Sequence, residues 1–409
     1  MIGRPGAASR GQGRSRAVTV VFRAGLLAIL ATVLAALRRP VGDWLIARTE
    51  RRLCPVAVPG PYRPSPWAAE LHRRLTVVDL HADSLLFGRN LLVRGSRGHV
   101  DLPRLVEGNV AIQVFATATK SPRHLNIERN DDRSDDVTFV AMAAGWPVRT
   151  WGSLLARAEY HADRLRRLAG DSGGALTIIE RAADVDALLA RRAAEPDLVG
   201  GILAIEGAHA LEDDVANLER IVNAGYRIVG LAHFFDNAFA GSAHGVAKRG
   251  LTAAGRDLVS ALDARSIVID LAHASPATIA DVAAEAGRPL LVSHTGVRAV
   301  ADNTRNLTDD QLRAVAATGG LIGIGFWPTA VGGDDAAAIA GAIVHAVNVV
   351  GADHVGLGSD FDGAVPTPFD ASGLPLLTEA LIARGLDEAA IAAVMGGSAV
   401  RFLRESLPA

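Results

Sequence analysis

Five residues with metal-binding side chains stand at or just past the ends of apolar, strand-like runs: His81, Asp83, Glu206, His273 and His294. Singly, each is weak evidence, because a buried histidine is usually structural. Their shared position is more informative, since the rim of a barrel of parallel strands gathers strand ends from distant parts of a sequence. Imidazole and carboxylate ligands without a thiolate suit zinc, or less selectively manganese, cobalt or iron.

The number of these residues indicates more than one metal ion. Five protein ligands exceed what a single catalytic zinc with an open position requires. Two metals about 3.5 Å apart, bridged by a carboxylate and a water, would use all five. Glu206 is the natural bridge, with His81 and Asp83 on one metal and His273 and His294 on the other. The ligand set therefore predicts a barrel metallohydrolase with a pair of metal ions.

Further polar residues follow other strand-like runs and are expected on the same rim. His233 follows the run 227–232, Asp360 follows 355–359, and Arg305 lies on a later loop. From position alone, a supporting role for each is as reasonable as a direct one. His209, three residues after Glu206, is a candidate to orient Glu206 from behind the metal ligands. Residues without this context are expected to be structural or exposed: Asp79, Asp270, His72, His99, His124, His161, His244, His345 and His354.

The ligands can converge only if the runs that carry them form one ring. Eight short runs rich in Val, Ile and Leu are candidate strands: 75–80, 109–116, 201–205, 227–232, 266–272, 289–293, 321–326 and 355–359. Helical stretches are expected between most of them, at 214–223, 252–263, 276–285 and 308–317, the last capped by Thr308. This alternation predicts an α/β fold, a (β/α)₈ TIM-type barrel. A doubly wound sheet is the alternative, but it would not bring so many strand ends onto one ring.

One segment is too long for a simple crossover. Residues 117–200 hold a polar loop and a helical stretch, Thr150–Leu168. We interpret the segment as an insertion after the second strand, beside the rim, where such loops shape substrate access.

The amino terminus differs in composition from the rest of the chain. Arginines precede an apolar stretch at 17–37, interrupted by Arg23, which is about long enough to span a bilayer. We expect residues 1–40 to hold an uncleaved apolar helix that anchors a bacterial protein, with the catalytic domain outside the cytoplasm. A mis-assigned start or a disordered tail is the alternative. The proline-rich residues 41–72 are expected to be an extended linker to a catalytic domain at 73–409.

Composition argues against a nucleic-acid-binding protein and against a small secreted scaffold held together by disulfides. The net charge of −2 gives no basis for a nucleic-acid partner. Cys54 is the single cysteine, so no intrachain disulfide can form.

Short motifs surround the candidate site residues. They are Val78-Asp-Leu-His81-Ala-Asp83, Ala204-Ile-Glu206-Gly, Leu231-Ala-His233, Ile269-Asp-Leu-Ala-His273-Ala-Ser275, Val292-Ser-His294-Thr, Arg305-Asn306 and Gly358-Ser-Asp360-Phe-Asp362-Gly363. In this order, from about residue 73 to the end, the set resembles the renal or membrane dipeptidase family, the M19 metallopeptidases. The single cysteine and a carboxyl terminus without an anchor signal depart from the animal members.

The resemblance implies a dipeptidase with two zinc ions bridged by Glu206. It implies that His233 contacts the tetrahedral intermediate, that Arg305 binds the substrate carboxylate, and that Asp360 handles the proton of the attacking water. Family members hydrolyse dipeptides, tolerate a C-terminal D-residue, and in some cases open β-lactams. A homodimer is a further expectation.

Two other functions compete with this interpretation. One is a related metal-dependent amide or lactone hydrolase, acting on N-acyl amino acids or β-lactams. The other is a membrane-tethered binding protein that kept the barrel but lost its chemistry. The presence of all five predicted ligands argues against the second.

Overall fold

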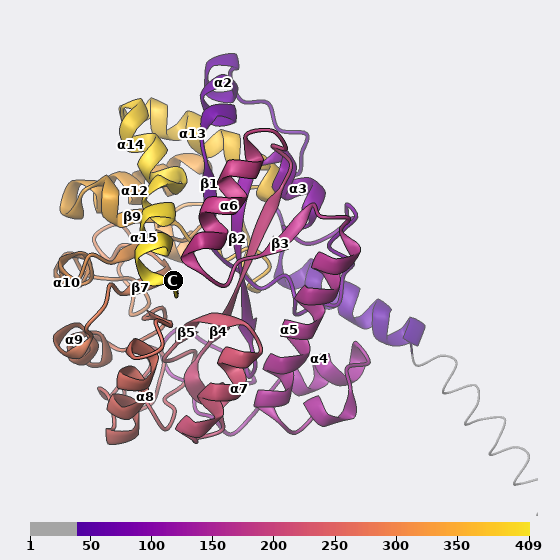
Figure 1. The fold of residues 1–409 in the computed structure, drawn as a ribbon, viewed down its shortest axis with the longest axis vertical. Coiled ribbons are helices and arrows are strands. Elements are labelled where there is room, and N and C mark those ends of the chain that lie inside the picture. Colours follow the sequence, from indigo (N-terminus) through magenta and orange to yellow (C-terminus); the bar gives the residue numbers. More distant parts are fainter. Residues whose placement is uncertain (1–38) are drawn as a thin grey trace, which may run out of the picture.

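Eight parallel strands close into a ring at the centre of the molecule (Figure 1). The computed structural model describes residues 39–409. The ring is formed by β1 (Val77–Ala82), β2 (Val110–Ala118), β4 (Val199–Glu206), β5 (Tyr226–Gly230), β6 (Val268–Asp270), β7 (Leu291–Thr295), β8 (Leu321–Ile324) and β9 (Val355–Leu357). Each strand pairs in parallel with its neighbours, and the pairings β1–β9 and β2–β4 complete the ring.

The strands are buried on both faces, as their continuous apolar sequences predict. Every residue of β1, β4 and β7 is buried. One set of side chains fills the barrel, and the other packs against the surrounding helices. These helices are α2 (Pro66–Arg74), α3 (Leu102–Glu107), α4 (Val137–Ala143), α5 (Leu154–Asp171), α6 (Ala182–Arg192), α7 (Leu218–Asn223), α8 (Ala253–Asp263), α9 (Pro276–Glu285), α10 (Asp309–Ala317), α11 (Pro328–Val331), α12 (Ala336–Val350), α13 (Leu374–Ala383), α14 (Glu388–Ala392) and α15 (Ser398–Ser406).

The barrel prediction is confirmed, and all eight predicted strands are present with ends that differ by a few residues. Local sequence signals also match: Thr308 caps α10 in a capping box with Gln311. The segment after β2 holds α4, α5 and α6, and also a short strand that was not predicted, β3 (Leu176–Ile178). This strand pairs with β4 outside the ring.

The segment expected to be an extended linker is partly helical and packs on the barrel. Residues 39–53 are helical, and Glu50 and Cys54 are buried. Ile46 and Cys54 pack in one apolar cluster with Phe87, which lies in the loop after β1. The prolines lie mainly in the extended stretch that precedes α2.

The predicted membrane anchor at 17–37 lies outside the described residues. Among residues 39–409, no helix is both long enough and apolar enough to cross a bilayer.

Close packing of neighbouring strands leaves no room for a side chain at Gly323 in β8. A Cβ at this position would lie 2.1 Å from the Ser293 carbonyl oxygen and 3.1 Å from the Gly358 Cα. Backbone atoms cannot move aside as a flexible side chain can. The barrel therefore needs a residue without a side chain at this point.

We expect Gly323→Ala to lower the free energy of unfolding by about 1–3 kcal/mol, the usual cost of overpacking. The matched control is Gly170→Ala in α5, where an added Cβ meets no atom within 4 Å. That change should be neutral or stabilise by up to about 1 kcal/mol. Thermal unfolding of both variants measures the difference, and equal effects would contradict this account of β8.

Candidate metal centre

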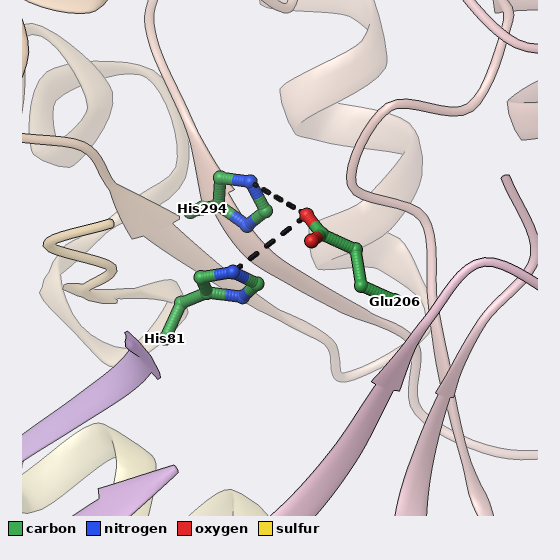
Figure 2. A group of neighbouring side chains, drawn as sticks. All are labelled: His81, Glu206 and His294. Carbon is green, nitrogen blue, oxygen red and sulfur yellow. Dashed lines mark ion pairs between the residues drawn. The ribbon is translucent and has the colours of Figure 1, made fainter. Parts of the chain in front are cut away.

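Glu206, the last residue of β4, directs its carboxylate toward the imidazoles of His81 and His294 (Figure 2). Its Oε1 lies 3.6 Å from His81 Nε2, 3.5 Å from His294 Nε2 and 3.1 Å from His273 Nε2. His81 and His294 belong to β1 and β7, and His273 follows β6. Asp83, just after β1, places Oδ2 3.3 Å from His81 Nε2. The five predicted ligands therefore converge, and each is at most 6% exposed.

The spacing of these donor atoms fits a cation. His273 Nε2 and His294 Nε2 lie 3.0 Å apart. Zinc–nitrogen bonds of about 2.0–2.1 Å in a tetrahedral arrangement place neighbouring ligand atoms roughly 3.3 Å apart. The distances from Glu206 Oε1 to the three imidazole nitrogens scatter around that value.

Buried polar atoms without hydrogen-bond partners also indicate a site for a cation. His81 Nε2, Asp83 Oδ1 and His273 Nδ1 are buried without a hydrogen-bond partner among residues 39–409. Such groups are costly to bury unless something pairs with them. A metal ion accepts the electron pairs of His81 and Asp83 directly, so the donor set fits the predicted cofactor.

The donor atoms form three overlapping groups that could each hold an ion: His81–Glu206–His294, Glu206–His233–His273 and His81–Asp83–Asp360. Glu206 belongs to two of these groups, as a bridging carboxylate should. The groups differ from the predicted partition, because His294 clusters with His81. His233 and Asp360 also lie close enough to join the ligand set: His233 Nε2 is 3.3 Å from Glu206 Oε2, and Asp360 Oδ1 is 4.0 Å from His81 Nε2.

The charges at the site are strongly coupled. Burial would lower the pKa of His81, but the carboxylates of Glu206, Asp83 and Asp360 outweigh burial and raise it to about 10. Burial raises the pKa of Glu206 well above its ordinary range, and Asp83 adds to that effect. Burial also raises the pKa of Asp360 to about 8. Without metal, the site therefore holds protons at neutral pH that a cation would displace.

A second layer of hydrogen bonds orients the ligands. The Ser293 hydroxyl lies 2.9 Å from His294 Nδ1 and 3.3 Å from His81 Nδ1, and it donates to Asp270 at 2.6 Å. Asp79 accepts hydrogen bonds from Ser359, next to Asp360. Asp79 and Asp270 thus support the rim from within strands, the structural role predicted for them.

A cavity of about 250 Å³ opens onto the site. His233, Arg305 and Asp360 all line it, so the structure brings the three additional candidates together with four of the metal ligands. Arg305 donates from Nη2 to the His294 carbonyl at 2.6 Å, and its guanidinium carbon lies 5.6 Å from the Trp327 ring centroid. Burial lowers the pKa of Arg305 to about 10, which leaves the guanidinium charged at neutral pH.

Two histidines differ from the sequence prediction. His209 does not hydrogen-bond Glu206; both of its ring nitrogens lack hydrogen-bond partners within residues 39–409, and its ring stacks on His233 at 6.3 Å. His244, expected to be structural or exposed, is buried and lines the cavity, and its ring centroid lies 5.1 Å from that of His273. It lies on the loop between β5 and α8, where no strand pattern marks it.

Comparison with known proteins places the chain among metallopeptidases. Residues 67–407 match the model of the membrane dipeptidase family, peptidase family M19. A dipeptidase of Claviceps purpurea, tcpJ, is 28% identical over 317 residues, which cover 75% of this chain and 69% of that protein.

Two solved structures share the fold. A metallopeptidase from Rhodobacter sphaeroides, bound to a phosphinate mimic of the dipeptide L-Ala-D-Ala, superposes with a TM-score of 0.66 at 27% identity. The match covers 81% of this chain and 99% of that one. A dipeptidase of family M19 gives a TM-score of 0.67 at 29% identity, covering 82% and 99% of the two chains.

Proton displacement at the site gives a pH-dependent prediction. In the metal-free folded chain, His81 and Asp360 keep protons up to pH values of about 10 and about 8. In the unfolded chain both groups lose them at lower pH. The folded state then binds more protons, so stability should fall as pH rises from about 7 to about 9.

Thermal unfolding of chelated protein across this range measures the effect, and calorimetry in buffers of different ionisation enthalpy counts the protons that Zn²⁺ releases on binding. We expect Zn²⁺ to raise the unfolding temperature and to release protons at pH 7. Zinc binding without proton release would contradict the charge state assigned to this site.

Proposed function

The chain belongs to the membrane dipeptidase family, peptidase family M19, whose members are metallopeptidases, and we propose that it hydrolyses dipeptides with two zinc ions bridged by Glu206. We further propose that its substrates include dipeptides with a C-terminal D-residue. The bound L-Ala-D-Ala mimic in the Rhodobacter relative supports this part of the proposal. The observation that carries the proposal is the shared position of the Glu206 carboxylate among imidazoles from three strand ends.

The proposed metal ligands are His81, Asp83, Glu206, His273 and His294. When bound, the two ions would supply a nucleophile at neutral pH, by acidifying water, and would polarise the scissile carbonyl. Their number and their identity as zinc are inferred from the donor set and from the family.

The other rim residues complete the reaction. Asp360 accepts the proton of the attacking water and passes it to the leaving amine. His233 donates a hydrogen bond to the oxygen that becomes negative in the tetrahedral intermediate. Arg305 binds the terminal carboxylate of the substrate through two parallel hydrogen bonds, which selects short peptides.

The proposal also includes the cellular location of the enzyme and its oligomeric state. The apolar stretch 17–37 supports attachment to a bacterial membrane, and we propose that the barrel lies outside the cytoplasm. Membrane protein fractionation before and after alkaline washing would test the attachment. A homodimer is proposed from the family, and analytical ultracentrifugation of residues 39–409 would test it.

Replacing Asp360 tests the proton-transfer step. Asp360→Asn keeps an oxygen at the site but removes the base, so kcat should fall about 10²–10⁴-fold. Metal content, measured by elemental analysis, should stay at the wild-type value. Unchanged turnover in a folded, metal-loaded variant would refute the role of Asp360.

Replacing Arg305 separates substrates that carry a terminal carboxylate from neutral amides and lactones. The cavity has an apolar wall that includes Leu86, Leu125 and Val137, which would also suit an N-acyl amino acid or a β-lactam. Arg305→Gln should raise KM for a dipeptide at least about 10-fold, because a charge-assisted pair is worth about 1.5–3 kcal/mol. KM for a neutral amide or lactone should change much less.

Metal content is the control, since Arg305 also donates to the His294 carbonyl. Equal KM changes for charged and neutral substrates would contradict carboxylate binding by Arg305. Efficient hydrolysis of lactones or N-acyl amino acids, with no hydrolysis of L-L or L-D dipeptides, would favour the alternative function.

A further inference from the structure

A fully buried carboxylate, Glu50, enters the barrel domain from a helix that the family model does not include. Glu50 lies within helical residues 39–53, whereas the family match begins at residue 67. Both of its oxygens are engaged, one by Arg89 Nε and the other by Arg97 Nε. A buried charge is retained only where partners compensate for the loss of water. The identity of those partners therefore shows what Glu50 holds in place.

Arg89 connects Glu50 to the loop that follows β9. Its three donor nitrogens bind three different groups: Nε binds Glu50, Nη1 donates to the Val100 carbonyl at 2.6 Å, and Nη2 donates to Asp362 Oδ2 at 2.5 Å. Arg89 is 6% exposed, and Glu50 and Asp362 are fully buried. One guanidinium thus lies between two carboxylates in an interior with little water.

Asp362 in turn holds the segments that carry site residues. Its carboxylate accepts hydrogen bonds from Ser84 Oγ at 2.6 Å and from the His99 amide at 2.6 Å. Ser84 follows the candidate ligand Asp83, whose own amide donates to the Phe361 carbonyl at 2.9 Å. Asp362 therefore joins the β1 end of the site to the β9 end.

The loop after β9 needs such support because its backbone is strained. Asp360, Asp362 and Ala364 have φ values of +58°, +62° and +62°. Residues other than glycine adopt this left-handed region only when the surrounding structure enforces it. Asp360, the proposed proton carrier, is the first of these three residues.

Backbone hydrogen bonds also join the amino-terminal segment to the residues after the β9 loop. The Ala57 amide donates to the Thr367 carbonyl at 2.9 Å, and the Thr367 amide donates to the Pro55 carbonyl at 3.1 Å. The residues just after the amino-terminal helix thus pair with the residues just after the strained loop. Two independent sets of contacts, one ionic and one between backbones, place the amino-terminal segment against this loop.

We propose that Glu50 is a positioning residue of the active site, which acts through Arg89 and Asp362 to hold the loop that presents Asp360. The amino-terminal segment is then part of the catalytic unit and not a spacer. This inference rests on the proposed function for the role of Asp360, whereas the link between Glu50 and the loop can be measured without any substrate.

The test compares Glu50→Gln with Glu180→Gln in metal-loaded protein. Gln at position 50 keeps a similar shape and an acceptor oxygen but removes the charge opposite Arg89. Glu180→Gln removes a carboxylate from a partly exposed ion pair, Glu180 Oε2 with Arg227 Nη2 at 2.7 Å, near β3 and away from the loop. Wild-type protein and both variants are studied as the full chain.

For Glu50→Gln we expect kcat to fall about 10–100-fold, since a displacement of about 1 Å of a catalytic group costs up to about 100-fold. KM for the dipeptide should stay within about 2-fold of wild type, because Arg305 does not contact the network, and metal content should be unchanged. Glu50→Asp, which keeps the charge, should recover part of kcat. Glu180→Gln should match the wild type in both constants.

Hydrogen–deuterium exchange gives a readout that does not depend on activity. Amides of residues 358–365 should exchange faster in Glu50→Gln than in wild type, and should be unchanged in Glu180→Gln. If Glu50→Gln does not fold, Arg97→Gln replaces it: Arg97 contacts Glu50 at the edge of the network, and its loss should give the same pattern with smaller amplitude.

Unchanged exchange at 358–365, or a kcat equal to that of Glu180→Gln in a folded variant, would overturn the inference. A fall in activity explained entirely by metal loss would also overturn it. Faster loop exchange in a protein whose wild type hydrolyses no dipeptide would instead refute the proposed function and leave the link between Glu50 and the loop intact.

Discussion

The structure depends on one electrostatic constraint: a glutamate carboxylate is buried at the mouth of a barrel, with imidazole nitrogens crowded around it. Glu206 is only 6% exposed there, and no arginine or lysine forms an ion pair with it among residues 39–409. Protons can satisfy such a cluster only in part, since His81 Nε2 and Asp83 Oδ1 remain without hydrogen-bond partners in this part of the chain. Divalent cations would neutralise the buried carboxylates and accept the electron pairs of the imidazole nitrogens together. The second layer around Ser293, Asp270 and the Asp360 loop is arranged to keep this geometry fixed.

Strand ends made the barrel and its candidate ligands predictable from the sequence. Strands buried on both faces are continuous apolar runs, and a polar residue at the end of such a run is conspicuous. This signal located Glu206 and His294. It could not locate His244, which reaches the cavity from a loop whose path depends on tertiary contacts. The short strand β3 was missed because three residues inside a helical insertion carry too little pattern. His209 was misplaced because sequence proximity to Glu206 does not determine ring direction.

The amino-terminal segment illustrates a different limit of sequence patterns. Its prolines suggested an extended linker, and that expectation considered local propensity alone. Glu50 gains its partners, Arg89 and Arg97, only after the chain has folded back onto the barrel. A buried ion pair between residues far apart in the sequence leaves no periodic signal. The candidate metal ligands and the residues that support them therefore come from different segments, and only the ligands lie in recognisable motifs.

Anomalous diffraction at the zinc absorption edge, from crystals grown with Zn²⁺, tests the central claim most directly. The account predicts two anomalous peaks about 3.5 Å apart, one on each side of the Glu206 carboxylate, with His81, His273 and His294 nitrogens directed at them. A single peak that Glu206 does not touch, or a Glu206 side chain turned away from the histidines, would contradict it.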